Sequence, residues 1–252
     1  MRKISFMLFL ILTNIVSGQE KKTISFDFGY GIHQYNMNSV NEFYIDSFLA
    51  TPDEDLLREY IKKGYSFRLG VNYSPFTWIE IGLNGDYQTS ALRSYKWYEY
   101  TESGSGETKY TKEHLELETK VFTMGIGTTF YGSELINNKT VFQKLRFGLE
   151  VYGGISFMKI VPNHWIHTFY TYEYTQEYSP KNQFSGQLGL KLEYDFTQTP
   201  IYTTLGLRAG YQFLKSGVVR DAAGQDWLVN DKHPISLDFS GFYFGVYLKI
   251  GK

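Results

Sequence analysis

A strict alternation of apolar and polar residues runs through most of this chain, and it constrains the fold more than any other feature. Between Ile24 and Ile32, for example, Ile, Phe, Phe, Tyr and Ile alternate with Ser, Asp, Gly and Gly. Successive side chains of a β-strand point to opposite faces of a sheet. Each such run therefore predicts a strand with one apolar face and one polar face.

The same alternation predicts eight strands, near 22–35, 65–75, 77–89, 118–132, 144–158, 184–196, 201–214 and 240–250. The connections between them alternate in length. Short ones are expected at Ser74–Phe76, 132–143 and 197–200, and long ones at 36–64, 90–117, 159–183 and 215–239. Alternate connections of an up-and-down barrel emerge at opposite ends, so the pattern predicts a barrel with a short-turn end and a long-loop end.

The two faces of these strands differ sharply in composition. The polar face is mainly Gly, Ser, Thr and Asn with one or two charges per strand, whereas a water-facing surface carries many Lys and Glu side chains. We therefore expect a membrane barrel with its apolar face outward, and the alternative is a soluble sandwich or lipocalin-type barrel with that face inward. The expected polar network of the lumen is Asp27, Arg68, Glu80, Asp86, Arg146, Glu150, Lys191, Glu193, Arg208 and Lys249. The expected lipid-facing residues are Phe26, Phe28, Tyr30, Phe67, Leu69, Val71, Leu188, Leu190, Leu192, Leu205, Leu207, Phe242, Phe244, Val246 and Leu248.

Composition narrows the possible functions. The chain has no cysteine, which excludes disulfides, thiolate metal sites and thiol nucleophiles. Its formal net charge is −1, so no basic surface indicates nucleic acid as a partner. Aromatic residues make up 18% of the sequence, an excess that suits a large surface at a membrane interface.

The N-terminus has the pattern of an export signal. Arg2 and Lys3 precede an apolar stretch from Ile4 to Val16, and Val16-Ser17-Gly18 matches a small-residue cleavage site. We expect a signal peptide over residues 1–18 and one barrel domain over 19–252, with a non-cleaved anchor as the alternative. No later segment has the roughly 20 apolar residues of a spanning helix, so a membrane protein with this sequence has to be a closed barrel.

With this signal, strand rhythm and loop asymmetry, the chain resembles the small outer-membrane β-barrel family of Gram-negative bacteria. It is similar to the OmpA-type transmembrane domain and its porin-like relatives. The resemblance implies an all-β fold, an eight-stranded antiparallel up-and-down transmembrane barrel with long extracellular loops. It also implies location in the outer membrane, contact with outer-membrane lipid and assembly by the outer-membrane insertion machinery.

The long connections carry further signals. Thr51-Pro52-Asp53-Glu54 is typical of a helix start, and Tyr60 and Ile61 belong to the apolar stripe of the helix expected after it. This helix is expected to cover the barrel mouth or, alternatively, to bind a partner or gate the barrel. Tyr95–Tyr100 and 108–118 flank Gly104-Ser105-Gly106 and predict a hairpin above the membrane. The segment 168–174 alternates as well and is expected to face 175–178 and beyond. The rings of these arms form either an interfacial girdle or a surface for an extracellular protein or glycan.

Motifs for chemistry are weak. His164 and His167 are the only closely spaced histidines, and no ligand-type side chain lies beside them, so no metal and no cofactor are expected. We expect a non-enzymatic barrel that acts through its outer loops in an envelope-structural, adhesion or receptor-like role. Two alternatives remain open. One is a narrow porin-like channel or hydrophobic-ligand conduit. The other is a barrel enzyme that hydrolyses lipid with a Ser–His pair at the depth of His33, or peptides with acidic residues at the rim.

Overall fold

A computed structural model describes residues 23–49, 59–102, 104–132, 144–167, 171–181, 183–196, 202–230 and 232–252. The expected export segment at 1–18 lies outside these residues. So do 51–58, where the expected helix would begin, and most or all of the short connections expected at 132–143 and 197–200.

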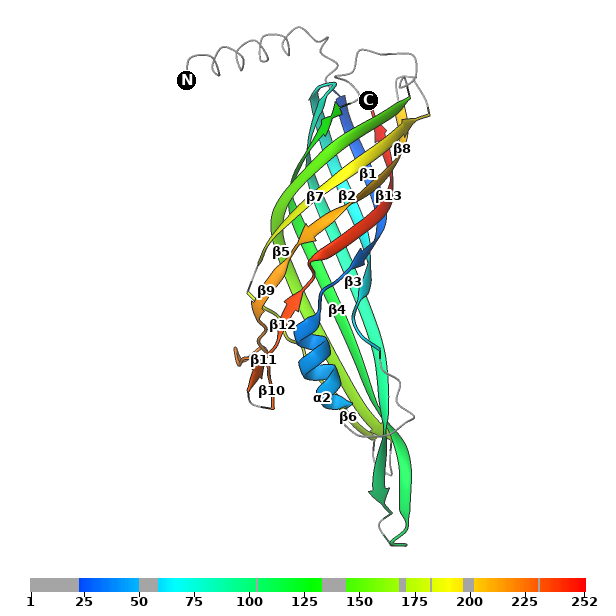
Figure 1. Cartoon of the computed structure of the whole chain (residues 1–252), viewed down its shortest axis with the longest axis vertical. Helices are drawn as coiled ribbons and strands as arrows, with labels where there is room; N and C mark the ends of the chain where they lie inside the picture. Colours follow the sequence, from blue (N-terminus) through cyan, green and yellow to red (C-terminus); the bar gives the residue numbers. More distant parts are fainter. Residues whose placement is uncertain are drawn as a thin grey trace.

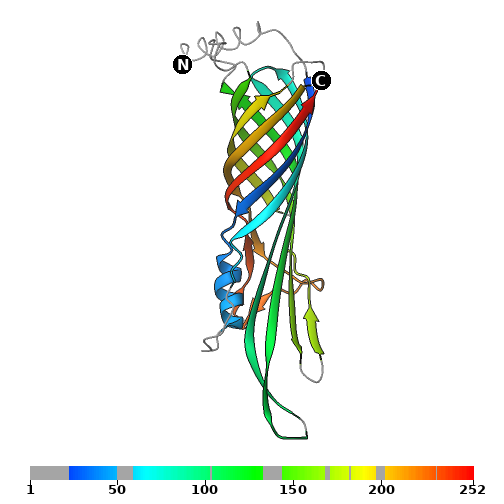
Figure 2. The same ribbon diagram turned by 90° about the vertical axis from the view of Figure 1, so that its right-hand side faces the viewer.

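Eight antiparallel strands close into a barrel, which confirms the predicted fold (Figures 1 and 2). Strand β1 pairs with both β2 and β13, and the pairing of β4 with β5 completes the ring. The barrel strands are β1 (Thr23–Gln34), β2 (Lys63–Phe76), β3 (Ile79–Thr101), β4 (Thr108–Tyr131), β5 (Leu145–His167), β7 (Gln183–Asp195), β8 (Tyr202–Phe213) and β13 (Gly241–Gly251).

The first short turn lies slightly later than expected. Strand β2 continues through Pro75 and Phe76, and the chain turns at Thr77 and Trp78. The β2–β3 register shifts between Tyr73 and Phe76. This irregularity accommodates Pro75, which has no N–H to donate to the neighbouring strand. The prediction of a turn at Ser74–Phe76 is therefore wrong, since the turn lies two to three residues later in the chain.

Three strands extend far beyond the barrel on the long-loop side (Figure 2). Strands β3 and β4 stay paired up to Thr101 opposite Thr108, with Gly104 and Gly106 at positive φ in the turn. The hairpin predicted within 90–117 is confirmed, and both of its strands continue those of the barrel without a break. Strand β6 (Thr171–Thr175) pairs with the end of β5, so the expected pairing of 168–174 with the next segment is wrong in its partner.

A helical segment that was not predicted from the sequence lies between β1 and β2. It consists of a π-helix, η1 (Ser39–Ile45), that continues into one turn of α-helix, α2 (Asp46–Phe48). Residues 59–62, the end of the expected helix, are not helical. Four short strands lie between β8 and β13: β9 (Lys215–Val218), β10 (Leu228–Val229), β11 (His233–Pro234) and β12 (Ser236–Asp238). Among the described residues, no helix has the length and apolar character needed to cross a membrane.

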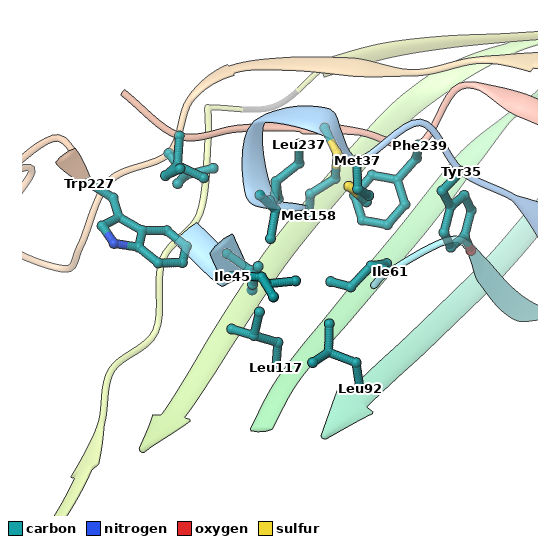
Figure 3. Packing of buried hydrophobic residues seen from close by; sticks show 14 of the residues in the cluster. Tyr35, Met37, Ile45, Ile61, Leu92, Leu117, Met158, Trp227, Leu237 and Phe239 are labelled. Carbon is teal, nitrogen blue, oxygen red and sulfur yellow. The ribbon is translucent and has the colours of Figure 1, made fainter. Parts of the chain in front are cut away.

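The main apolar core of this protein lies beyond the barrel mouth rather than inside the barrel. The inner faces of the extended β3, β4 and β5 pack there against η1 and the β9–β12 region (Figure 3). We call this assembly the cap. Its buried side chains are Tyr35, Met37, Val40, Ile45, Leu49, Ile61, Leu92, Leu115, Leu117, Val121, Met158, Ile160, Leu214, Val219, Trp227, Val229, Ile235, Leu237 and Phe239.

Candidate functional site

The outer surface of the barrel is an apolar belt. All fifteen residues expected to face lipid point outward, with exposed fractions from 39% at Leu207 to 66% at Leu190. A continuous belt of this kind is unfavourable in water. The soluble-barrel alternative is therefore wrong, since the rings lie outside and the charges inside. The closed ring leaves no strand edge in hydrocarbon, and the chain is a transmembrane β-barrel of the outer-membrane type.

Aromatic pairs lie toward both ends of this belt. At the turn end, Phe76 and Trp78 stack with ring centroids 5.7 Å apart. Tyr30 and Tyr65 stack near the loop end at 6.2 Å. Rings at these levels form the interfacial girdles of a membrane barrel. The barrel strands themselves thus supply rings for the girdles. The sequence allows this role for the rings of the extended segments as well.

The lumen is filled by an ion network, and Lys249 is at its centre. This side chain is fully buried and donates to Glu80 (2.8 Å), Glu193 (2.5 Å) and the Tyr131 hydroxyl (2.9 Å). Arg146 also pairs with Glu193, at 2.7 Å. Arg146 is the only one of the ten expected network residues that is not buried, with 20% of its side chain exposed near the turn end.

Further along the barrel, a second group of charges spans the lumen. Arg68 pairs with Glu150 at 2.7 Å, and Lys191 lies 3.2 Å from the same carboxylate. A void of only about 10 Å³ beside Asp27, Arg68 and Arg208 is close to the volume of a single water molecule. Five cations and five carboxylates are thus gathered in one lumen, and Asp86 completes the set. Equal numbers are expected because a buried charge needs a partner.

Glutamine side chains separate these charges from the cap. Gln88 donates to Gln212 at 2.8 Å, and Gln187 donates to the same residue at 3.0 Å. The hydroxyl of Tyr35 in the cap core donates to Gln88 at 3.3 Å. Sequence reasoning missed this layer. The signal was available, because each glutamine occupies an inward position near the loop end of the barrel wall.

Glycines in the strands make room for rings inside the barrel. A Cβ atom on Gly206 would lie 2.1 Å from the ring of Tyr247. The Tyr247 hydroxyl donates to Glu193 at 2.7 Å. Glycine weakens a strand by its flexibility, and here that cost is offset by the ring that fills the space.

A serine and a histidine do meet inside the barrel. His33 Nε2 lies 3.0 Å from the Ser66 hydroxyl, and both residues are buried. The other ring nitrogen, Nδ1, has no hydrogen-bond partner among the described residues. A hydrolase needs a group that orients the base and a path for the substrate. This pair has no oriented third group in the described part of the chain and lies between the ion network and the cap.

A second histidine lies where the cap meets the arm, the part of β3, β4 and β5 that extends beyond the barrel. His164 Nε2 donates to Glu113 Oε1 at 2.5 Å, and Lys96 Nζ lies 3.2 Å from the same carboxylate. The Phe48 ring of α2 contacts both side chains, with the Lys96 ammonium 4.6 Å and the His164 ring centroid 5.4 Å from its centroid. Partial burial raises the pKa of the Glu113 carboxyl, but the His164 hydrogen bond and the Lys96 charge outweigh it and lower that pKa below 4.5. Within the described ranges, no three His, Asp or Glu side chains converge as metal ligands.

The cap carries a polar cleft of about 620 Å³. Tyr178 and Trp227 form one wall and stack with centroids 4.4 Å apart. Gln176 and Asp221 also line the cleft; the Gln176 amide accepts from the Tyr178 hydroxyl at 2.8 Å and donates to the Asp221 carboxylate at 3.3 Å. Gln225 lies exposed on the rim and is bound to Asp221 through its backbone N–H, at 2.8 Å. The cleft therefore offers rings, amides and carboxylates together.

Comparison with known proteins gives no family. No family model and no curated protein matches the chain. Solved structures with a similar fold include Ail, the attachment invasion locus protein of Yersinia pestis in complex with the heparin analogue sucrose octasulfate, at 11% identity and a TM-score of 0.38 over 92% of this chain and 99% of that one. A major outer membrane protein from Thermus thermophilus has 13% identity and a TM-score of 0.41 over 90% and 98% of the two chains. Neisserial surface protein A has 10% identity and a TM-score of 0.33 over 91% and 96%. These values are too low for any of the three to inform the function of this chain.

Proposed function

We propose that this barrel is a non-conducting, non-enzymatic outer-membrane protein that displays the cap at the cell surface for recognition of an extracellular ligand. The observation that supports this proposal best is the double closure of the lumen. Charged pairs fill the barrel, and a packed apolar core covers its long-loop end. In outer-membrane barrels, the long-loop end faces the outside of the cell. The proposed role is receptor-like or adhesive. The alternative that needs no ligand is a purely structural role in the envelope.

Conductance separates this proposal from the channel alternative. We expect flat current traces when the refolded protein is inserted into planar bilayers. The reason is that the interior of an eight-stranded barrel is just wide enough for side chains to fill. Insertion is verified in the same preparation by protection of the barrel strands from protease. Discrete current steps from verified inserted protein would favour the narrow channel or conduit.

The cleft on the cap is the best candidate for the recognition surface, and its chemistry favours a glycan. Aromatic walls with a few polar groups that fix orientation are typical of ligand sites. The amides of Gln176 and Gln225 can donate to and accept from sugar hydroxyls. The carboxylates of Asp221 and Asp226 line the same cleft and disfavour anionic sugars. We therefore propose a neutral oligosaccharide as the ligand.

The experiment is a screen of immobilised neutral and anionic oligosaccharides with the purified full-length protein. Gln225→Ala should weaken binding to any neutral hit by about 3- to 10-fold, since one or two hydrogen bonds are lost. The structural bond of Gln225 to Asp221 uses the backbone and survives the change. Gln34→Ala removes an exposed amide at the end of β1 as the matched control and should leave binding unchanged. Equal binding of the neutral oligosaccharide by Gln225→Ala and Gln34→Ala would contradict the proposal. Binding of anionic sugars only would also contradict it.

A further inference from the structure

The outer face of β3, β4 and β5 changes abruptly from rings to charges at the loop end of the belt. Tyr87, Phe122 and Phe157 form one row across the three strands, since Phe122 is the register partner of both other residues. All three rings are exposed on the outside. In the next row, one residue pair toward the arm, Lys120 and Lys159 lie directly opposite each other on β4 and β5.

These two rows line a single pocket of about 390 Å³. Phe122 and Phe157 form its apolar part, and Lys120 and Lys159 form its charged part. Ser179 also lines it, because the segment after β6 continues along β5 through the bridge between Ile160 and Tyr178. The pocket thus has one side in the apolar belt and one side above it.

The charges around the pocket are arranged in pairs. Lys120 contacts Glu118 at 2.8 Å, and Lys159 contacts Glu177 at 2.8 Å. Two lysines directly opposite each other on neighbouring strands repel unless an anion lies between them. Each ammonium can donate three hydrogen bonds, so one carboxylate contact leaves donors for a further acceptor. The two glutamates balance the two lysines, which makes the pocket a weak site for a small free anion.

We propose that this pocket binds the phosphate headgroup of a membrane lipid in the outer leaflet. The phosphate would accept hydrogen bonds from Lys120, Lys159 and the Ser179 hydroxyl, and the acyl chains would lie over Phe122 and Phe157. The apolar contact supplies the affinity that the balanced charges lack, which commits the site to a lipid rather than to free phosphate. This inference depends on the barrel spanning the membrane and is independent of the cleft on the cap.

The test is native mass spectrometry of the full-length protein in detergent, titrated with phosphatidylglycerol. The double variant Lys120→Gln/Lys159→Gln should lower the affinity of the tightest lipid adduct by about tenfold or more, because hydrogen bonds between charged groups are lost. Lys109→Gln/Lys112→Gln removes two lysines of β4 that lie farther along the arm and should leave the affinity unchanged. Inorganic phosphate at equal concentration should not displace the lipid.

Three outcomes would overturn the proposal. The first is an equal affinity of wild type and the Lys120/Lys159 variant for phosphatidylglycerol. The second is displacement of the lipid by inorganic phosphate, which would show an anion site without lipid selectivity. The third is an equal loss in the control variant, which would show a general effect of positive charge. Retention of the folded barrel in each variant is checked by its resistance to unfolding by SDS without heating.

Discussion

Lys249→Met should lower the free energy of unfolding of the barrel by about 3–5 kcal/mol. The ammonium is fully buried and donates to Glu80, Glu193 and Tyr131. Removal of one partner from a buried charge network leaves the other charges uncompensated, which costs more than the pair itself contributes. The measurement is urea-induced unfolding in lipid vesicles, followed by tryptophan fluorescence.

Two further variants make this prediction specific. Lys215→Met makes the same chemical change at an exposed position of β9 and should alter stability by less than about 0.5 kcal/mol. The double variant Lys249→Met/Glu80→Gln removes one charge of each sign, leaves Glu193 paired with Arg146, and should recover part of the loss. If Lys249→Met is as stable as Lys215→Met, the ion network does not hold the barrel together.

Leu117→Ala should open the cap while the barrel stays folded. Leu117 is fully buried in the cap core on the inner face of β4. Truncation of a buried leucine to alanine costs about 2–5 kcal/mol, so the open cap should become about 30-fold or more populated. Backbone bonds from Val219 to Ile235 and from Ile235 to Trp227 hold the far side of the cap. Hydrogen exchange of the amides in 219–235 should therefore accelerate by that factor.

Leu190→Ala is the matched control for this change. Leu190 lies in the apolar belt with 66% of its surface exposed, outside the cap. Lipid fills the space of the removed methyl groups, so exchange in 219–235 should be the same as in wild type. Unchanged exchange in Leu117→Ala would mean that the cap is held by contacts other than its apolar core. Loss of barrel strands in Leu117→Ala would mean that cap and barrel unfold as one unit.

The sequence predicts the barrel and its two faces well, because these depend on local alternation. Phe26 and Asp27 are neighbours in the chain and lie on opposite faces in the structure, at 51% and 5% exposure. The identity of the ion partners was not predictable. Lys249 and Glu80 are 169 positions apart, and only closure of the ring brings the last strand near the third. The near balance of positive and negative charges could be inferred from the sequence. Which charges contact each other could not, because that depends on the register of all eight strands.

The cap was harder to predict than the barrel. Val40 and Ile45 are both buried on one side of η1, five residues apart, which fits a π-helix and does not match the spacing of an ordinary helix. The capping signal at Thr51 predicted a separate helix farther along the chain, of which only the end, at 59–62, lies among the described residues. Trp227 lies in a segment with little alternation, and its ring packs against Tyr44 of η1 and Tyr178, both distant in the sequence. The cleft between Gln176 and Gln225 has the same origin and was not predicted.

The contact between Lys249 and Glu80 has a consequence for biogenesis. During synthesis, Glu80 and Glu193 are both made before the C-terminal strand that carries Lys249. Until that strand docks between β1 and β8, these two carboxylates lack the lysine that lies between them, and the incomplete sheet presents an excess of acid to the bilayer. Stepwise entry of single hairpins is therefore unfavourable. Membrane entry and ring closure should occur as one concerted event, with arrival of the final segment as its trigger.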